Sequence, residues 1–597
     1  MLKEHNDDKL LSLHVDTVAV PFYQVWQELV ESRTLDVYQY RVLTSLSGLI
    51  ELKSVIEKTL SGLFNTDANI EACREELLYL LNKDLILETH YKPLLNRLRA
   101  SIGKKPSNTA DKNRLLQQIS YAIKSIETEY FNHALNDLKN SILAKDLEKI
   151  EVYANIVASQ AIFMGWSAQA LSELMRCFRQ ERSFDDQWNS FKHEILRPNT
   201  EYCVLINIPL KNQTPDEQES TLTTLTRLGL TIKTHTEIVQ EFSEIEHIER
   251  QVNARKRYFS VNVMAKDVYA ASHLAITKIS EQLNFASFYN LVDAWDLKSV
   301  VIVSINTCSM YYKIFTAEKL YATHNYIDSS GRIFESTRRI FENQENYAIR
   351  EKLQGSFGYT NISRCSLFQE EKYMNLWVAL ESLARTNMYS DIISNVKETV
   401  PAALCLRYIY RIVRNFVEDC KRCNISLDFS TTSIDMDQPK KQKMVTEMIV
   451  AFKDDSLFNE LQVKCQVNTL LANRTNGIRK LLLDASYAKS KIENHYKHIH
   501  WQLQRLYRIR NEIAHAALRE QSSLIVYIEH LYHYLTTYIS EIVTCLSEKK
   551  LSTIEEALCL IKDNYDVFIS IADTADKTLI ENDLLQNGII NLINVRV

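Results

Sequence analysis

Glycine and proline are scarce in this 597-residue sequence, with 10 and 8 copies respectively. Both residues interrupt helices and both build tight turns, so their scarcity argues against a β-sandwich or a collagen-like chain and favours long helices. The hydrophobic content of 46% and the charged content of 24% are ordinary for a folded globular protein. A chain of this length is expected to form two to four domains.

Long apolar runs are missing as well. The β-rich run from Tyr202 to residue 208 is far shorter than the roughly 20 apolar residues of a membrane helix. The N-terminus, Met1-Leu-Lys-Glu-His-Asn-Asp-Asp, is polar and acidic, whereas a secretion signal starts basic and then becomes apolar. The sequence therefore predicts a cytoplasmic protein that does not interact with a membrane.

The usual patterns for binding a metal or a nucleotide cofactor are absent. Cys420 and Cys423 are the only close pair among 11 cysteines, and a second pair is missing, so ordinary thiols are favoured over zinc. His495, His498 and His500 cluster, but no carboxylate or cysteine is fixed near them in the sequence. Rossmann and Walker phosphate loops are also absent. We therefore expect no metal and no cofactor.

An excess of positive charge is not present either. The net charge is −5 and the isoelectric point is near 6.3. Binding to a nucleic acid would therefore have to come from a local basic patch and not from the overall charge.

The apolar pattern divides the chain into five segments and predicts a mostly α, multidomain fold. Residues 1–198 have the three- and four-residue apolar spacing of helices. After Pro198, β-rich runs alternate with helical stretches, which predicts a central α/β or α+β domain. The expected segments are a helical N-terminal region (1–198), the α/β domain (199–320), a helical connector (321–367), a helical bundle (368–547) and a helical tail (548–597). Within the connector we expect a glycine turn at 355–358. Within the bundle we expect an insertion (about 424–480) that starts with an exposed loop (424–442).

One stretch late in the chain combines three side chains suited to phosphate chemistry. Arg510 and Asn511 are followed, after three residues, by His515, within a run that has no glycine or proline. On a helix, Asn511 and His515 lie on one face and Arg510 lies one step around; Arg508 is also close to that face. A permanent cation, an amide and an imidazole could hold a phosphodiester and move a proton.

This pattern resembles the Arg-x(4–6)-His signature of the HEPN superfamily, which usually has a polar residue after the arginine. A second stretch, Tyr373-Met-Asn-Leu-Trp-Val-Ala-Leu-Glu381, is similar to a helix of the ApeA-like HEPN proteins. In that group the arginine–histidine motif lies on a later helix of the same bundle. The resemblance covers residues 368–547, so the predicted bundle is HEPN-like.

The resemblance implies a metal-independent endoribonuclease, with tRNA as one candidate substrate. In such enzymes the 2′-OH of the RNA attacks the adjacent phosphate, which leaves a 2′,3′-cyclic phosphate. His515 would act as general acid or base, Arg510 would hold phosphate oxygens, and Asn511 would position a phosphate oxygen or fix the histidine tautomer. HEPN ribonucleases place two motifs face to face in a homodimer. By resemblance, the context is prokaryotic antiviral defence by abortive infection, in which the N-terminal part senses a phage-derived trigger or restrains the nuclease.

Further residues of the same two stretches are assigned supporting roles. Glu381 lies on an otherwise apolar helix face, and we expect Arg510 or Arg508 to be its partner. Cations interleaved with aromatic rings suit single-stranded RNA, although aromatic side chains at helical spacing more often belong to a core. The residues assigned to RNA on this ground are Lys497, Arg505, Trp501 and Tyr507.

Two other functions fit the same residues. A HEPN bundle without activity would serve as a scaffold for RNA binding or dimerisation, and it would tolerate the loss of His515. A toxin of a toxin–antitoxin pair would be regulated by covalent modification of a tyrosine near the motif, such as Tyr507.

Overall fold

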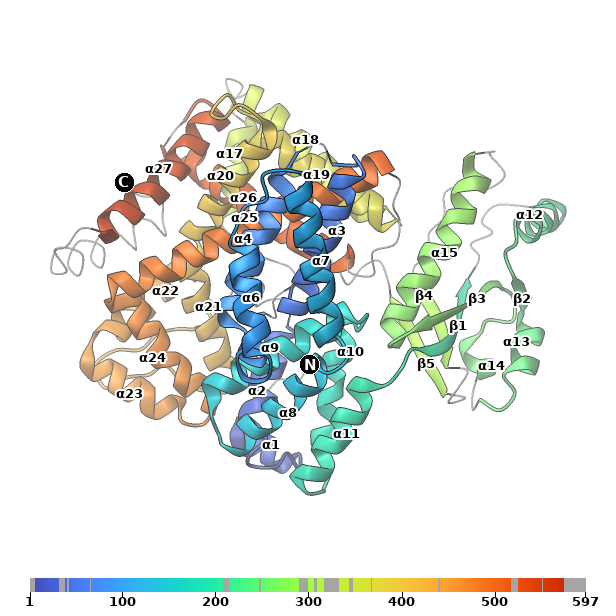
Figure 1. Cartoon of the computed structure of the whole chain (residues 1–597), viewed down its shortest axis with the longest axis horizontal. Helices are drawn as coiled ribbons and strands as arrows, with labels where there is room; N and C mark the ends of the chain where they lie inside the picture. The colour runs from blue at the N-terminus through green and yellow to red at the C-terminus, as the bar shows by residue number, and fades with distance from the viewer. Residues whose placement is uncertain are drawn as a thin grey trace.

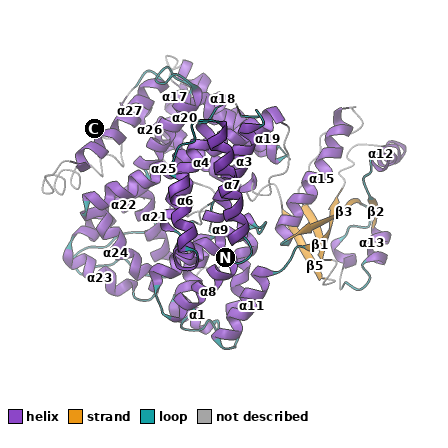
Figure 2. Ribbon diagram, in the orientation of Figure 1, coloured by secondary structure: helices purple, strands orange, loops and turns teal. Residues whose placement is uncertain are grey.

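The structure is a computed structural model, and helices dominate it (Figures 1 and 2). It describes residues 6–573 except 32–37, 40–41, 65, 208–213, 246–247, 289–298, 305–308, 316–331, 343–346, 367, 439–440, 517–523 and 550. The mostly α, multidomain fold expected from the sequence is confirmed. Among the helices of the described ranges, none has both the length and the apolar character needed to cross a bilayer.

The N-terminal region is a helical body with its own core. The hydroxyl, carboxylate or amide oxygens of Thr44, Asp84, Asn108, Asp146 and Ser183 each accept an amide hydrogen at the start of the following helix, which fixes where that helix begins. Its helices are α1 (Asp7–Ser12), α2 (Val20–Leu29), α3 (Ser45–Leu60), α4 (Ala68–Lys83), α5 (Leu85–His90), α6 (Lys92–Ile102), α7 (Thr109–Ile126), α8 (Tyr130–Leu143), α9 (Leu147–Phe163), α10 (Ala168–Glu173), the 3-10 helix η2 (Leu174–Phe178) and α11 (Phe184–Leu196).

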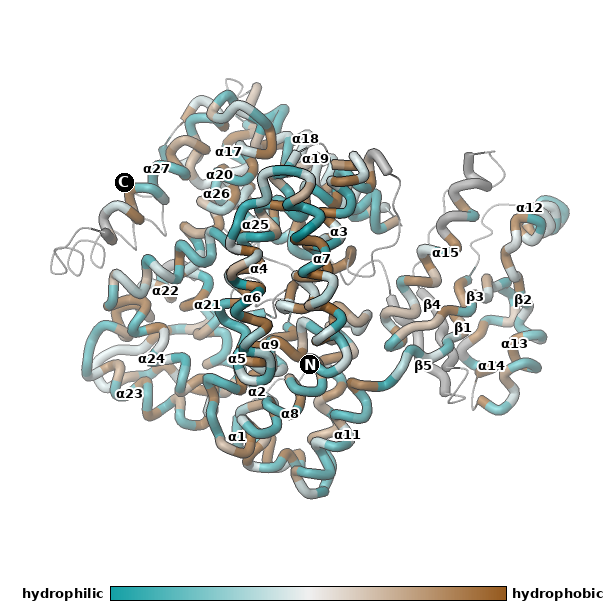
Figure 3. The backbone as a smooth tube through the Cα atoms, in the orientation of Figure 1, coloured by the Kyte–Doolittle hydropathy of each residue, from teal (hydrophilic) through white to brown (hydrophobic). Residues whose placement is uncertain are grey.

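Aromatic side chains from both ends of this region meet in its centre. The rings of Phe22, Trp26 and Phe191 lie with centroids 5.4–5.7 Å apart, and all three side chains are buried. Aromatic side chains bury large apolar areas, so this contact holds α2 against α11. Figure 3 shows that hydrophobic and hydrophilic residues alternate along the helices.

The central domain is an antiparallel sheet with the strand order β2-β3-β1-β4-β5. Side chains alternate along β1: Tyr202, Val204 and Ile206 join a core with α15, whereas Cys203 and Leu205 join a second core with α13 and α14. The all-antiparallel pairing makes this domain α+β. Its elements are β1 (Thr200–Asn207), α12 (Pro215–Arg227), β2 (Ile232–Thr234), α13 (His235–Glu241), α14 (Ile248–Gln251), β3 (Arg257–Ala265), α15 (Val268–Phe288), β4 (Ser299–Ser304) and β5 (Ser309–Phe315).

The C-terminal part is a helical bundle with one continuous core. Helices that the sequence assigns to the connector, the insertion and the tail all contribute buried side chains to this core, among them Leu353, Phe452 and Leu558. Its helices are α17 (Arg332–Glu342), α18 (Tyr347–Cys365), α19 (Gln369–Ala384), α20 (Ile392–Leu406), α21 (Tyr408–Arg422), α22 (Lys441–Lys453), α23 (Asp455–Cys465), α24 (Thr469–Leu483), α25 (Ala485–Ala516), α26 (Leu524–Lys549) and α27 (Ile554–Asp573).

Two local predictions in this part are wrong. Gly355 and Gly358 do not form a turn but lie inside α18, where an added Cβ would meet nothing within 4 Å. The stretch 424–442 is not simply exposed, because Ile425, Leu427 and Phe429 are buried in the bundle core. Apolar residues spaced through a polar stretch were the overlooked signal. The predicted helical pieces after residue 573 lie outside the described residues.

The sheet domain lies at one side of the helical body, and the chain enters it from α11 (Figure 1). A second connection is made by Asp267, which is 2% exposed. Its carboxylate accepts the Ser167 amide and hydroxyl hydrogens, at 2.8 and 2.9 Å, and the Ala270 amide hydrogen at 2.9 Å. Asp267 therefore caps α15 and also ties the sheet domain to the start of α10.

Replacing Asp267 by alanine tests this connection. We expect Asp267→Ala to lower the free energy of unfolding by about 3 kcal/mol, because several buried donors lose their acceptor at once. The measurement is urea unfolding followed by circular dichroism. Asp216, which is exposed in the first turn of α12, provides the control. Equal effects of Asp267→Ala and Asp216→Ala would contradict the assignment.

Candidate functional site

The two sequence stretches that resemble the HEPN motif lie on helices that pack against each other. The Tyr373 hydroxyl of α19 donates a hydrogen bond to the Leu506 carbonyl of α25. Four residues further along α19, the Trp377 ring lies 5.8 Å from the Tyr507 ring, centroid to centroid. Residues more than 120 positions apart in the sequence therefore meet in one part of the bundle.

Arg510 is the arginine that remains available at this place. Its Nη1 donates to the Asn511 Oδ1 at 3.0 Å, and its buried Nε finds no hydrogen-bond partner among the residues that the structure describes. Among the described residues, no carboxylate forms an ion pair with it. The Asn511 amide thus orients the Arg510 guanidinium, a role that the sequence did not suggest.

His515 lies in the last turn of α25, on the same helix face as Asn511. Its side chain lies outside the described residues. The predicted roles of this imidazole as acid or base therefore stay predictions.

Glu381 does not pair with Arg510 or Arg508, so this prediction is wrong. Its carboxylate accepts a hydrogen from the Trp377 Nε1 at 2.8 Å and lies 3.8 Å from the Arg385 guanidinium. Both partners are four residues away on α19, where helix geometry brings side chains together. Glu381 acts within its own helix and fixes the Trp377 ring against Tyr507.

Arg508 and Arg505 are turned away from the motif and toward the N-terminal region. Arg505 is 2% exposed, and its Nε and Nη2 contact the two Glu51 carboxylate oxygens of α3 at 2.8 and 3.0 Å. Arg505 also pairs with Glu76 of α4, and Arg508, 5% exposed, pairs with the same Glu51. The assignment of Arg505 to RNA is therefore wrong for this structure, because its guanidinium is used in buried ion pairs.

These contacts belong to a polar seam between α25 and the helices α3 and α4. Burial by itself would raise the pKa of Glu51, but Arg505 and Arg508 outweigh it and hold that pKa below its ordinary value. The seam continues with Gln504, whose Nε2 donates to Asn69 at 2.9 Å, and with Lys58, whose Nζ lies 2.7 Å from a Glu512 oxygen. It thus ends one residue from Asn511.

The remaining residues assigned to RNA differ in exposure. Trp501 is 8% exposed, and its ring lies 5.6 Å from that of Tyr79, so it serves the packing of α25 on α4 and is not free to stack on a base. Tyr507 is half-buried against Trp377. Lys497 is exposed. Of the four, Lys497 is the residue that a nucleic acid could reach in this conformation.

Three histidines of α25 and α26, His495, His500 and His530, have pKa values lowered from the ordinary value by burial. Burial lowers the pKa of His500 to about 4 and that of His530 to about 3. His495 is buried against the Tyr408 ring at 4.3 Å, and burial lowers its pKa as well. Within the described ranges, no group of three or more histidine, cysteine, aspartate or glutamate side chains is placed to hold a metal.

Sequence reasoning missed the acidic side of the seam. Glu51, Glu76 and Lys58 lie more than 400 residues before their partners, and nothing in their local sequence marks them. The one available signal was the pair Arg505 and Arg508, three residues apart on a helix. Two arginines on a face that also carries buried residues require acidic partners.

The structure predicts opposite consequences for two neighbouring arginines. Arg508→Ala should lower the free energy of unfolding by about 3 kcal/mol, because Glu51 stays buried with one cation fewer. Arg510→Ala should change it by no more than about 1 kcal/mol, since its guanidinium contacts only the adjacent Asn511. Urea unfolding of both variants beside the parent protein measures the difference, and a larger loss for Arg510→Ala would refute the assignment.

Comparison of the chain with models of protein families, with curated proteins and with solved structures finds no match.

Proposed function

We propose that the protein is an endoribonuclease of the HEPN type, with Arg510, Asn511 and His515 at its site. The observation that carries the proposal is the packing of the Trp377–Glu381 helix on the Arg510–His515 helix, with Arg510 not used in an ion pair among the described residues. A structural arginine would be paired with a carboxylate, as Arg505 and Arg508 are. Arg510 instead keeps its donors for an anion.

The reaction would be attack of a ribose 2′-OH on the adjacent phosphorus. The new 2′-O–P bond forms while the P–O5′ bond breaks, which leaves a 2′,3′-cyclic phosphate and a 5′-OH. One group must remove the 2′-OH proton and another must give a proton to the leaving 5′-oxygen. Arg510, oriented by Asn511, would stabilise the negative charge on the phosphate oxygens. This chemistry uses side chains alone and needs no metal.

A homodimer would supply both proton-transfer groups. One His515 cannot serve as acid and base for the same bond at the same moment, whereas two copies facing each other can. By the resemblance to ApeA-like proteins, the cytoplasmic setting would be prokaryotic antiviral defence, with RNA such as tRNA as substrate and a phage-derived trigger.

The polar seam supports a restraining role for the N-terminal region. Helices α3 and α4 hold α25 through the ion pairs of Arg505 and of Glu512, and Glu512 lies within the motif itself. A change in the N-terminal region would therefore act directly on the helix that carries Arg510 and His515. Buried pairs of this kind fix one arrangement and are costly to break singly.

A catalytically silent scaffold for RNA binding or dimerisation is the alternative, and a toxin of a toxin–antitoxin pair is another. Arg510, which forms no ion pair within the described part of the chain, would serve RNA binding equally well in a scaffold. The nuclease requires His515 for RNA cleavage, whereas the scaffold does not require it for RNA binding. A cleavage assay distinguishes the two functions.

The first test is RNA cleavage by the full-length protein in EDTA. We expect the parent protein to cleave total RNA or tRNA to 2′,3′-cyclic phosphate ends. His515→Ala and Arg510→Ala should each lower the rate at least about 100-fold, as expected for the loss of a proton-transfer group or of an oxyanion donor. Mass spectrometry of the product ends identifies the chemistry.

His193→Ala is the matched control, because His193 is an exposed histidine on α11, far from the motif in the sequence. It should cleave like the parent protein. Equal cleavage by His515→Ala would place the chemistry elsewhere. RNA binding that survives in His515→Ala without cleavage by any form would favour the scaffold.

The restraint can be tested at the edge of the seam. Lys58→Ala removes the contact to Glu512, and Lys58 is partly exposed, so the fold should persist. We expect this variant to cleave RNA several-fold faster than the parent protein, because α3 no longer holds the end of α25. Lys53→Ala, on the same helix with an exposed pairing to Glu57, is the control. An unchanged or lower rate for Lys58→Ala, with normal folding, would argue against restraint.

A further inference from the structure

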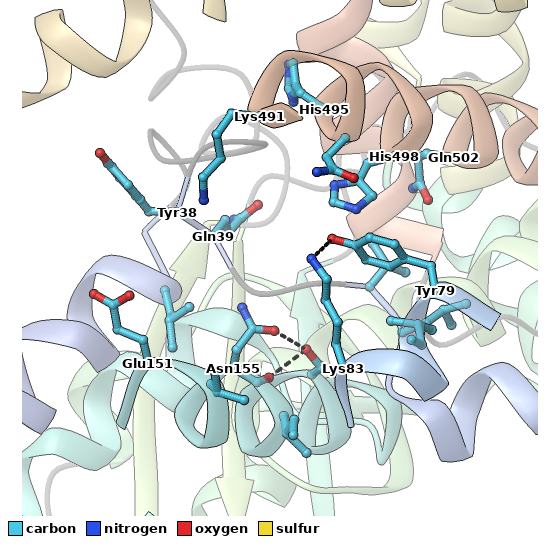
Figure 4. Close-up of a pocket in the computed structure, with 18 of the residues that line it drawn as sticks. Tyr38, Gln39, Tyr79, Lys83, Glu151, Asn155, Lys491, His495, His498 and Gln502 are labelled. Carbon is cyan, nitrogen blue, oxygen red and sulfur yellow. Dashed lines mark hydrogen bonds between the residues drawn. The ribbon is translucent and has the colours of Figure 1, made fainter. Parts of the chain in front are cut away.

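A cavity of about 610 Å³ separates the N-terminal region from the bundle. Its walls come from α4 and α9 on one side and from α24 and α25 on the other (Figure 4). This volume falls in the range of cavities that bind small molecules. The cavity lies on the opposite end of the polar seam from Arg510, since α25 contributes Lys491, His498 and Gln502 to it.

The acidic side chains that line the cavity are already engaged. Glu28 and Glu151 lie 2.6 and 3.3 Å from the Arg474 guanidinium, and burial raises the pKa of Glu28 to about 7. Asp84 accepts the Tyr130 hydroxyl hydrogen at 2.6 Å and the Leu87 amide hydrogen at 2.8 Å. The lining acids are therefore neutralised or hydrogen-bonded by the protein itself.

Two lysines in the same cavity are not neutralised by any carboxylate of the described residues. Lys83 rises from α4 and Lys491 descends from α25 toward the space between the two halves (Figure 4). Lys83 donates to the Tyr79 hydroxyl at 2.7 Å, and Lys491 lies 5.2 Å from the centre of the Tyr487 ring. Among the described residues, neither forms an ion pair with a carboxylate. Lys83 and Lys491 are therefore the lining cations open to an anion, whereas Arg474 is used by Glu28 and Glu151.

The wall beside these lysines is aromatic and includes a buried side-chain amide. The Tyr79 ring lies 4.9 Å from the His498 ring and 5.6 Å from that of Trp501, and both neighbours are tilted against it. Next to it, Gln502 is 5% exposed. Its Oε1 accepts a hydrogen bond from Arg505, and its Nε2 has no hydrogen-bond partner within the described ranges. A buried amide N–H without an acceptor costs free energy that a ligand oxygen would recover.

We propose that this cavity binds a nucleoside phosphate, with the phosphate between Lys83 and Lys491 and the base against Tyr79 and beside the Gln502 amide. Phosphate groups match paired lysines, and a flat base with ring carbonyls matches an aromatic wall that carries an amide donor. Gln502 also holds Arg505, so the bound ligand contacts a side chain that belongs to the polar seam. The proposal does not depend on ribonuclease activity.

Isothermal titration calorimetry of the full-length protein tests it without any RNA. The probes are the four ribonucleoside monophosphates and triphosphates, with the four ribonucleosides and inorganic phosphate as the two halves of the ligand. We expect saturable binding of at least one nucleotide, and binding of each half at least tenfold weaker. Lys83→Gln and Lys491→Gln should each weaken nucleotide binding about tenfold, since each removes one charge-assisted contact.

Gln502→Leu probes the base side, and Lys124→Gln, an exposed lysine of α7 that does not line the cavity, is the control. Circular dichroism melting of each variant without ligand shows whether it is folded. Gln502→Leu should weaken nucleotides but not inorganic phosphate. The proposal is overturned if no nucleotide binds up to millimolar concentration, if the folded lysine variants bind like Lys124→Gln, or if phosphate alone binds as well as the nucleotide.

Discussion

The two helical halves of this protein are joined through buried charge. Arg505 and Arg508 of α25 share Glu51 of α3, and Arg505 also reaches Glu76 of α4. An ion pair buried in this way gains little over an apolar contact, but losing one partner leaves an uncompensated charge. The rest of the structure depends on this constraint, because it fixes the orientation of the helix that carries both the motif and one wall of the cavity.

The direction of the side chains along α25 follows from that orientation. The face with Arg505 and Arg508 is turned to the N-terminal region, which leaves Arg510, two residues on, with Asn511 as its hydrogen-bond partner. Successive residues on a helix are about 100° apart, so a helix held on one side presents its other side to a different environment. The same helix therefore combines structural arginines with one available for an anion.

Much of the fold could be predicted from local pattern. Scarce glycine and proline indicated the long helices, and the runs after Pro198 predicted the strands that form the sheet. The Gly355–Gly358 prediction failed because glycine is tolerated inside a helix when neighbouring residues such as Leu353 are buried. Buried residues within 424–442 were missed although Ile425, Leu427 and Phe429 alternate with polar residues, because the polar composition of the stretch was given more weight than this short alternation.

The sequence by itself determined the helical character of the chain, the mixture of strands and helices in its central domain, and the spacing that puts Asn511 and His515 on one helix face. Tertiary structure alone decided which arginine pairs with no carboxylate of the described residues. Glu51 and Glu76 lie more than 400 residues from Arg505, and only the packing of α3 and α4 on α25 brings their charges together. Local spacing fixes the faces of a helix, whereas the partner of each face is set by burial among distant segments.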